Sequence, residues 1–147
     1  LTDCVVIGPG EAAMLSALQF GDRFSILSSE PSPRGFRRRL RGAGIAERFV
    51  SERGVGASVS DLRRKPNAAF KGMVSAAKAC LADGADVLVL GCLAACFIEG
   101  LPERLQAATG VPVINPVIAG LKSAEAAFHY GVGRKARRAS AGRKRPR

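Results

Sequence analysis

Two patterns of hydrophobic and polar positions alternate along the chain. Short continuous apolar runs are typical of strands buried on both faces of a parallel sheet, and the clearest is Val87–Leu90 within the segment 85–91. Longer segments carry apolar residues at helical spacing, best seen where Phe70, Val74 and Ala77 follow Pro66. The pattern predicts strands at 4–7, 23–27, 48–52, 85–91 and 110–114, and helices at 11–20, 33–43, 66–83, 98–108 and 117–128.

The regular alternation of strands and helices predicts an α/β fold with a parallel sheet flanked by helices. A chain of 147 residues, 47% of them apolar, fits one globular domain with a real core. We place this domain at 1–130 and expect a disordered basic tail at 131–147.

A short internal repeat links the two ends of the predicted domain. The segment 7–9 (Ile-Gly-Pro) matches 114–116 (Ile-Asn-Pro) at an offset of 107, and the small residues that follow match as well. Both copies read as a strand, a proline turn and a helix of small residues. Two similar strand–helix units also arise by chance, so the repeat alone does not establish a duplication.

The net charge of +11 comes from two segments. The tail 131–147 holds eight basic residues and the run 34–41 holds five, and neither contains an acid. The remaining ten basic residues are balanced by 12 acids. The tail lacks interleaved aromatic residues, so we interpret it as a solvated, charged segment. Contact with nucleic acid is the alternative.

Cysteine usage points to a reducing environment. The cysteines at 4, 80, 92 and 96 form no Cys-x-x-Cys pair, and the single His129 supplies no zinc-ligand set, so we expect neither metal nor disulfide. No signal peptide or membrane-length apolar run is visible, which predicts a cytoplasmic protein. Because the chain begins at Leu1 and enters a strand almost at once, we expect a fragment.

Cys92 is the strongest candidate for chemistry. It follows the buried strand 85–91, and open α/β sheets bind ligands beyond the carboxyl ends of their strands. A helix N-terminus after it would favour the thiolate over the thiol. The alternative is that Cys92 packs in the core, as we expect of Cys4, Cys80 and Cys96.

Other polar and glycine positions are predicted at the same edge of the sheet. The turn 8–11 lets backbone approach a ligand, and Ser28 and Ser29 end the second strand, although turn chemistry and loop capping explain them as well. Asn115 ends the last strand, where it either contacts a ligand or starts the helix. His129 is more typical of a surface cap.

Four blocks of sequence together resemble the aspartate/glutamate/hydantoin racemase superfamily, most closely its hydantoin and allantoin racemase branch. They lie at 10–14, 21–25, 83–92 and 110–116, in the family's order and spacing. The resemblance implies a two-lobed pseudo-symmetric fold. This chain would be its C-terminal half, with one lobe plus the last strand and helix of the other.

In this family, cofactor-independent racemisation uses two cysteines on opposite faces of the stereocentre, as thiolate and thiol. Cys92 matches the second of them. The first lies in a motif before the strand that begins here at Cys4, so the resemblance leads us to expect a chain without the N-terminal lobe, in which Cys4 does not replace that residue. In this family a small residue, then glycine and methionine, usually follows the second cysteine, whereas here Leu93, Ala94 and Ala95 follow, so we expect Leu93 to crowd the pocket or to misplace its amides.

The resemblance implies a racemase or epimerase that moves a proton at the carbon next to a carbonyl in hydantoins or amino acids, or an inactive truncated form of one. A one-cysteine decarboxylase or cis–trans isomerase of the same superfamily, and a non-enzymatic binding module with a basic tail, remain alternatives. We expect a small-molecule substrate, no cofactor, no membrane contact and self-association through the face left by the missing lobe. Cys92 is the expected catalytic residue, and the expected substrate contacts are Gly8, Gly10, Glu11, Ser28, Ser29, Leu93, Ala94 and Asn115.

Overall fold

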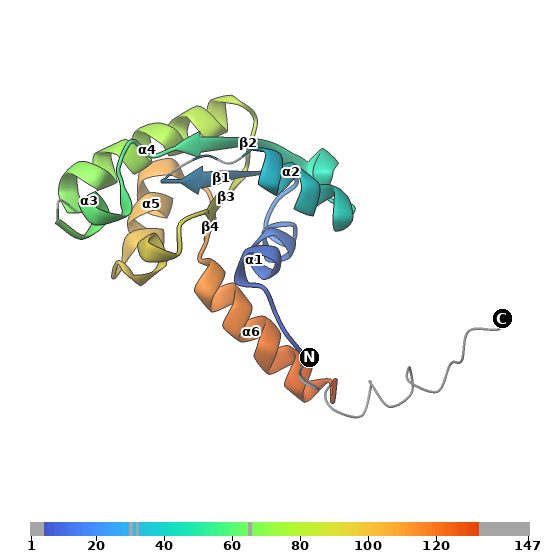
Figure 1. Ribbon diagram of the computed structural model, residues 1–147. Coiled ribbons are helices and arrows are strands. Elements are labelled where there is room, and N and C mark those ends of the chain that lie inside the picture. The colour runs from blue at the N-terminus through green and yellow to red at the C-terminus, as the bar shows by residue number, and fades with distance from the viewer. Residues whose placement is uncertain (1–4, 30, 32, 65, 133–147) are drawn as a thin grey trace.

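The computed structural model describes residues 5–29, 31, 33–64 and 66–132. This part of the chain forms a four-stranded parallel sheet in the order β2-β1-β3-β4, with helices on both faces (Figure 1). The α/β prediction is therefore confirmed. The strands are β1 (Phe24–Ser28), β2 (Phe49–Gly54), β3 (Val87–Leu90) and β4 (Val113–Ile114). The helices are α1 (Pro9–Ala17), α2 (Pro33–Gly42), α3 (Val59–Arg64), α4 (Pro66–Ala82), α5 (Leu101–Thr109) and α6 (Pro116–His129), with 3₁₀ turns η1 (Ala46–Arg48) and η2 (Leu93–Phe97).

The strand register fixes where a ligand can bind. In β1, Leu27 pairs with Leu90 of β3, and Leu88 of β3 pairs with Val113 of β4. Because all pairs are parallel, the carboxyl ends of the strands lie along one edge, called here the carboxyl edge. This is the edge where an open α/β sheet builds its site.

One face of the sheet is covered by α3, α4, α5 and η2. Leu27, Leu88 and Leu90 point to this face and are buried in the larger apolar cluster. The guanidinium of Arg104 on α5 lies 4.1 Å from the ring centre of Phe70 on α4, which joins the two helices by a cation–π contact.

The opposite face is covered mainly by α1, with contributions from α2 and α6. Phe24, Ile26, Val87 and Val89 are buried there together with Met14 of α1. This division follows from the two-residue period of a strand, which sends alternate side chains to opposite faces. Figure 1 shows α6 running from the end of β4 away from the sheet, beside α1.

The strand predicted at 4–7 is wrong as far as the structure describes it. Residue 4 lies outside the described part, and 5–8 form no strand, with Val6 82% exposed. A strand needs a neighbouring ladder to satisfy its backbone, and the four described strands pair only with one another. The helix expected at 11–20 instead runs over α1, starting at Pro9, whose fixed φ suits the first helical position.

Two other boundaries differ from the prediction. The helix expected at 98–108 begins only at Leu101, because η2 occupies the preceding segment and Gly100, at φ 64°, separates the two. The strand expected at 110–114 is reduced to the two residues of β4. Of the tail predicted at 131–147, the residues from 133 on lie outside the described part.

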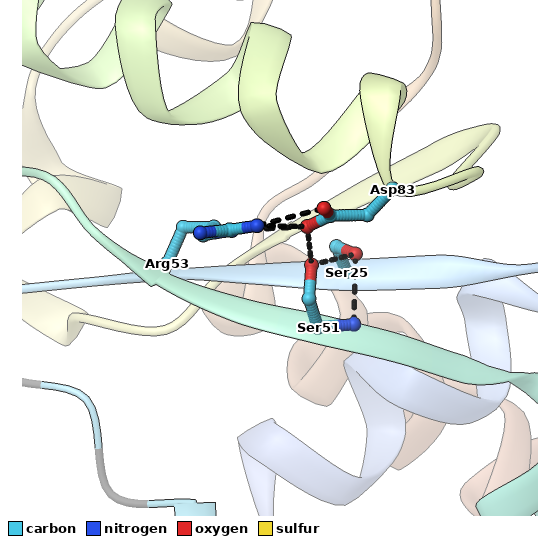
Figure 2. A network of polar contacts seen from close by, with 4 residues as sticks. All are labelled: Ser25, Ser51, Arg53 and Asp83. Atoms are coloured by element: carbon cyan, nitrogen blue, oxygen red, sulfur yellow. Dashed lines mark hydrogen bonds and ion pairs between the residues drawn. The ribbon is translucent and has the colours of Figure 1, made fainter.

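A polar network ties β1, β2 and the end of α4 together (Figure 2). Arg53 donates two hydrogens from its guanidinium to Asp83, with its closest contact at 2.7 Å, and the Ser51 hydroxyl donates to the same carboxylate at 2.7 Å. These hydrogen bonds, that of Arg53 first, lower the pKa of Asp83. Ser25 accepts the backbone N–H of Ser51 at 3.1 Å. Since Asp83 precedes β3, the network lies away from the carboxyl edge and is structural.

Candidate active site at the carboxyl edge

Cys92 lies two residues beyond β3, at the start of η2. Its side chain is half-buried and packs against the apolar cluster on the α4 side of the sheet. Its carbonyl oxygen accepts the N–H of Ala95 at 3.1 Å and the thiol of Cys96 at 3.5 Å. The element that follows is a five-residue 3₁₀ turn rather than the full helix expected, so the dipole acting on Cys92 is smaller than the sequence suggested.

A cavity of about 400 Å³ lies at the carboxyl edge, next to the chain segment that carries Cys92, although Cys92 itself is not among its lining residues. Both neighbours of the cysteine, Gly91 and Leu93, line it, and so does the turn 8–11 at the start of α1. Leu93 is half exposed. Four of the expected substrate contacts are thus brought together: Gly8, Gly10, Glu11 and Leu93.

The rest of the cavity wall is of two kinds. The floor consists of the buried apolar residues Met14, Ile26 and Val89. The rim also includes Arg39 of α2, which sequence reasoning treated only as one member of the basic run 34–41. Nothing in a helical run of arginines distinguishes the one that faces a cavity, because that depends on how the helix docks.

Ser28 does not line the cavity but contacts the chain at Gly91. It is only 4% exposed, and its hydroxyl donates to the carboxylate of Glu52 at 2.6 Å. A Cβ added to Gly91 would lie 2.4 Å from the Ser28 hydroxyl oxygen, so the two residues are in direct contact. The neighbouring Ser29 is half-buried and is not part of the cavity wall described above. Ser28 therefore holds the chain at Gly91, next to Cys92.

Glu52 is a residue that sequence reasoning missed. Its carboxylate reaches Ser28 because β2 pairs with β1, and Glu52 lies opposite Ile26 in that pairing. The sequence placed Glu52 at the end of a predicted strand but gave no register between strands. No local signal could have found this contact.

Asn115 and Ala94 do not reach the cavity beside Cys92. Asn115 caps α6, since its side-chain oxygen accepts the N–H of Val117 at 2.9 Å, and its amide group donates to the carbonyl of Cys96 at 3.0 Å. It lines a separate cavity of about 640 Å³ between α1, η2, α5 and α6. Ala94 packs against the core cluster. The helix-start interpretation of Asn115 is the one the structure supports.

The other described cysteines are core residues. Cys80 is fully buried and Cys96 nearly so, and burial raises the pKa of both thiols. Cys4 lies outside the described residues, and His129 is exposed at the end of α6. Within the described part of the chain, no three His, Cys, Asp or Glu residues gather as metal ligands, and no helix is long and apolar enough to span a membrane.

The internal repeat corresponds to two similar helix starts. Gly8 and Asn115 precede α1 and α6 with φ/ψ of −80°/120° and −90°/114°, and a proline follows each. The two helices pack side by side, and a Cβ on Gly120 would lie 3.2 Å from the Cα of Pro9. The similarity at 7–9 and 114–116 is thus one of local structure as well as of sequence, except that 7 is not in a strand.

Comparison with known proteins identifies a matching family and relatives of similar sequence. The family model for Asp/Glu/Hydantoin racemase matches residues 1–124. The chain is 35% identical over 133 residues to hydantoin racemase from Paenarthrobacter aurescens, covering 89% of this chain and 55% of the relative. It is also 35% identical to hydantoin racemase from Rhizobium meliloti, over 86% of this chain and 52% of that protein.

Two solved structures of allantoin racemases have a fold similar to that of this chain. Allantoin racemase from Pseudomonas fluorescens superposes with a TM-score of 0.76 at 32% identity, covering 85% of this chain and 53% of that one. Allantoin racemase from Klebsiella pneumoniae gives a TM-score of 0.73 at 29% identity, covering 87% and 52%. The chain therefore spans about half the length of the proteins it matches.

Proposed function

Since the chain belongs to the Asp/Glu/Hydantoin racemase family, we propose that it supplies one half of a cofactor-independent racemase, with Cys92 as one of the two proton-transfer groups. The observation that carries this proposal is the cavity beside Cys92. Gly91 and Leu93, on either side of the cysteine, line it together with the turn 8–11. A substrate bound there would lie next to the chain segment that carries Cys92, and proton transfer requires the half-buried thiol, which packs toward the α4 side, to turn toward the cavity.

The reaction follows from the chemistry of a carbon next to a carbonyl. The Cys92 thiolate removes the proton from the stereocentre and becomes a thiol, while the electron pair moves onto the carbonyl oxygen. A second acid on the opposite face then donates its proton to the carbon and inverts it. Cys80 and Cys96 are buried in the core, so the second thiol of such a pair is not among them. The prediction that this chain is the C-terminal half of the enzyme stays a prediction.

The substrate class we propose is a hydantoin substituted at ring carbon 5. The relatives are hydantoin and allantoin racemases, and allantoin is itself a hydantoin with a ureido substituent. A cavity of about 400 Å³ lies within the range of small-molecule sites, roughly 300–1,000 Å³. The one described thiol at this edge also keeps one-thiol protonation, as in a decarboxylase of the same family, as the second candidate.

Solvent-deuterium exchange tests the proposal directly. The protein is incubated in D₂O with allantoin and a set of 5-substituted hydantoins, and loss of the C5 proton is followed by NMR against a protein-free blank. Exchange should disappear in Cys92→Ser and persist in Cys96→Ser, a control four residues away in the core. Equal exchange in the wild type and Cys92→Ser would contradict the proposed role, and so would the absence of protein-dependent exchange with every compound.

A further inference from the structure

One arginine of the basic run 34–41 faces the candidate site. Leu40 is fully buried and anchors α2 against the sheet, and this docking places Arg39 in the wall of the cavity beside Cys92. Arg38 and Arg41 belong to the same helix and are also exposed, but neither lines the cavity. The position of Arg39 therefore results from the packing of α2 and not from the basic composition alone.

The surroundings of Arg39 favour a specific role. Met14, Ile26 and Val89 form an apolar floor that is almost completely excluded from solvent. Beside such a surface the effective dielectric falls, and a hydrogen bond from a cation to an anion is stronger than in open water. A guanidinium presents its donors in a planar fork that matches the two oxygens of a carboxylate.

We propose that Arg39 selects the substituent on the substrate's stereocentre and favours one that ends in a carboxylate over an apolar one of similar size. This inference rests on the proposed function, because it assumes that the cavity holds a 5-substituted hydantoin. Glu11 brings a negative charge to the same cavity, so Glu11→Gln should strengthen the binding of an acidic substituent. Arg39 is then the attractive element that outweighs this repulsion.

Binding without turnover provides the test. Dissociation constants of hydantoin-5-acetic acid and 5-isobutylhydantoin are measured by titration calorimetry on the full chain, for the wild type, Arg39→Leu and Arg38→Leu. Loss of one charged hydrogen-bonding group in a partly open site should weaken acid binding about tenfold in Arg39→Leu. The isobutyl compound should bind Arg39→Leu as well as the wild type or better. Arg38→Leu removes the same charge from the same helix and should change neither constant.

Several outcomes would overturn the inference: equal effects of Arg39→Leu on both compounds, equal effects of the two arginine variants, or no binding of either compound. Repeating the titrations in Cys92→Ser separates it from the proposed function. If Arg39 distinguishes the acidic from the isobutyl compound but no exchange depends on Cys92, the racemase proposal alone is contradicted. Cys92-dependent exchange together with equal effects of Arg39→Leu on the binding of the two compounds would contradict this inference alone.

Discussion

Replacing Gly91 with alanine should destabilise the protein, because there is no room for a side chain at this position. The new Cβ would lie 2.4 Å from the hydroxyl oxygen of Ser28 and 2.7 Å from the Cγ2 of Ile26. Both atoms belong to buried residues of β1, so neither can swing into solvent. Relief of the contact requires that the end of β3 move away from β1 or that both side chains shift.

The size of the effect can be worked from these contacts. Forcing a methyl group into a packed interior costs roughly 1–3 kcal/mol. Displacement of Ser28 also breaks its hydrogen bond to Glu52, which contributes about 1 kcal/mol. Against this, alanine reduces the entropy of the unfolded chain and recovers roughly 0.4–1 kcal/mol. The free energy of unfolding of Gly91→Ala should therefore fall by about 1–4 kcal/mol.

Urea denaturation followed by circular dichroism measures this change. Gly42→Ala is the matched control, because Gly42 ends α2 and a Cβ there would meet nothing within 4 Å. It should leave the protein as stable or slightly more so. Adding Ser28→Ala to Gly91→Ala should cost less than Ser28→Ala alone, since removing the hydroxyl relieves the contact. A Gly91→Ala midpoint equal to that of the wild type, or full additivity of the two changes, would refute the reasoning.

Three further predictions follow from the polar contacts and the cysteines. The Arg53 hydrogen bond lowers the folded-state pKa of Asp83, so the ionised carboxylate stabilises the protein above its ordinary pKa of about 3.9. This stabilisation is lost as the pH falls through the lowered, folded-state pKa. In urea titrations Asp83→Asn should be less stable than the wild type near pH 7, and the difference should close below about pH 4. Asn115→Ala removes the α6 cap and should lower the free energy of unfolding by about 1–2 kcal/mol, and an unchanged denaturation midpoint would count against the cap. Iodoacetamide should label half-buried Cys92 in the native protein before Cys80, whose pKa burial raises, and mass spectrometry showing equal labelling of both would contradict this.

The fold was largely predictable because its signals are local. The continuous apolar run at 87–90, within the predicted strand 85–91, is long enough to identify the central strand β3, and the helical spacing after Pro66 identifies α4. The strand predicted at 4–7 failed for a non-local reason. Its β-branched residues favour a strand, but strand formation depends on a neighbouring ladder, and the sequence does not show which ladders exist.

The candidate site was predictable only in part. The position of Cys92 follows from the rule that parallel strands present their carboxyl ends at one edge. The turn 8–11 reaches the same edge for another reason, because no described strand precedes it and the packing of α1 against β3 brings it there. The roles of Ser28 and Asn115 depend on partners elsewhere in the chain. In the structure Ser28 bonds to Glu52 and Asn115 bonds to the backbone of Cys96, so neither lines the cavity beside Cys92. Arg39 could not be selected from its neighbours, because only the docking of α2 decides which face of that helix meets the cavity.

The cavity beside Cys92 is assembled from segments about 80 residues apart, and the packing of α1 explains how they meet. Met14 and its neighbours on α1 are buried against β3, which places the N-terminal turn of α1 over the end of that strand. On its other side α1 packs along α6, where Gly120 lets the helix approach Pro9 closely. A side chain at Gly120 would contact Pro9, which lines the cavity. The shape of the cavity therefore depends on the contact between the two helices that carry the internal repeat, and not on the sheet alone.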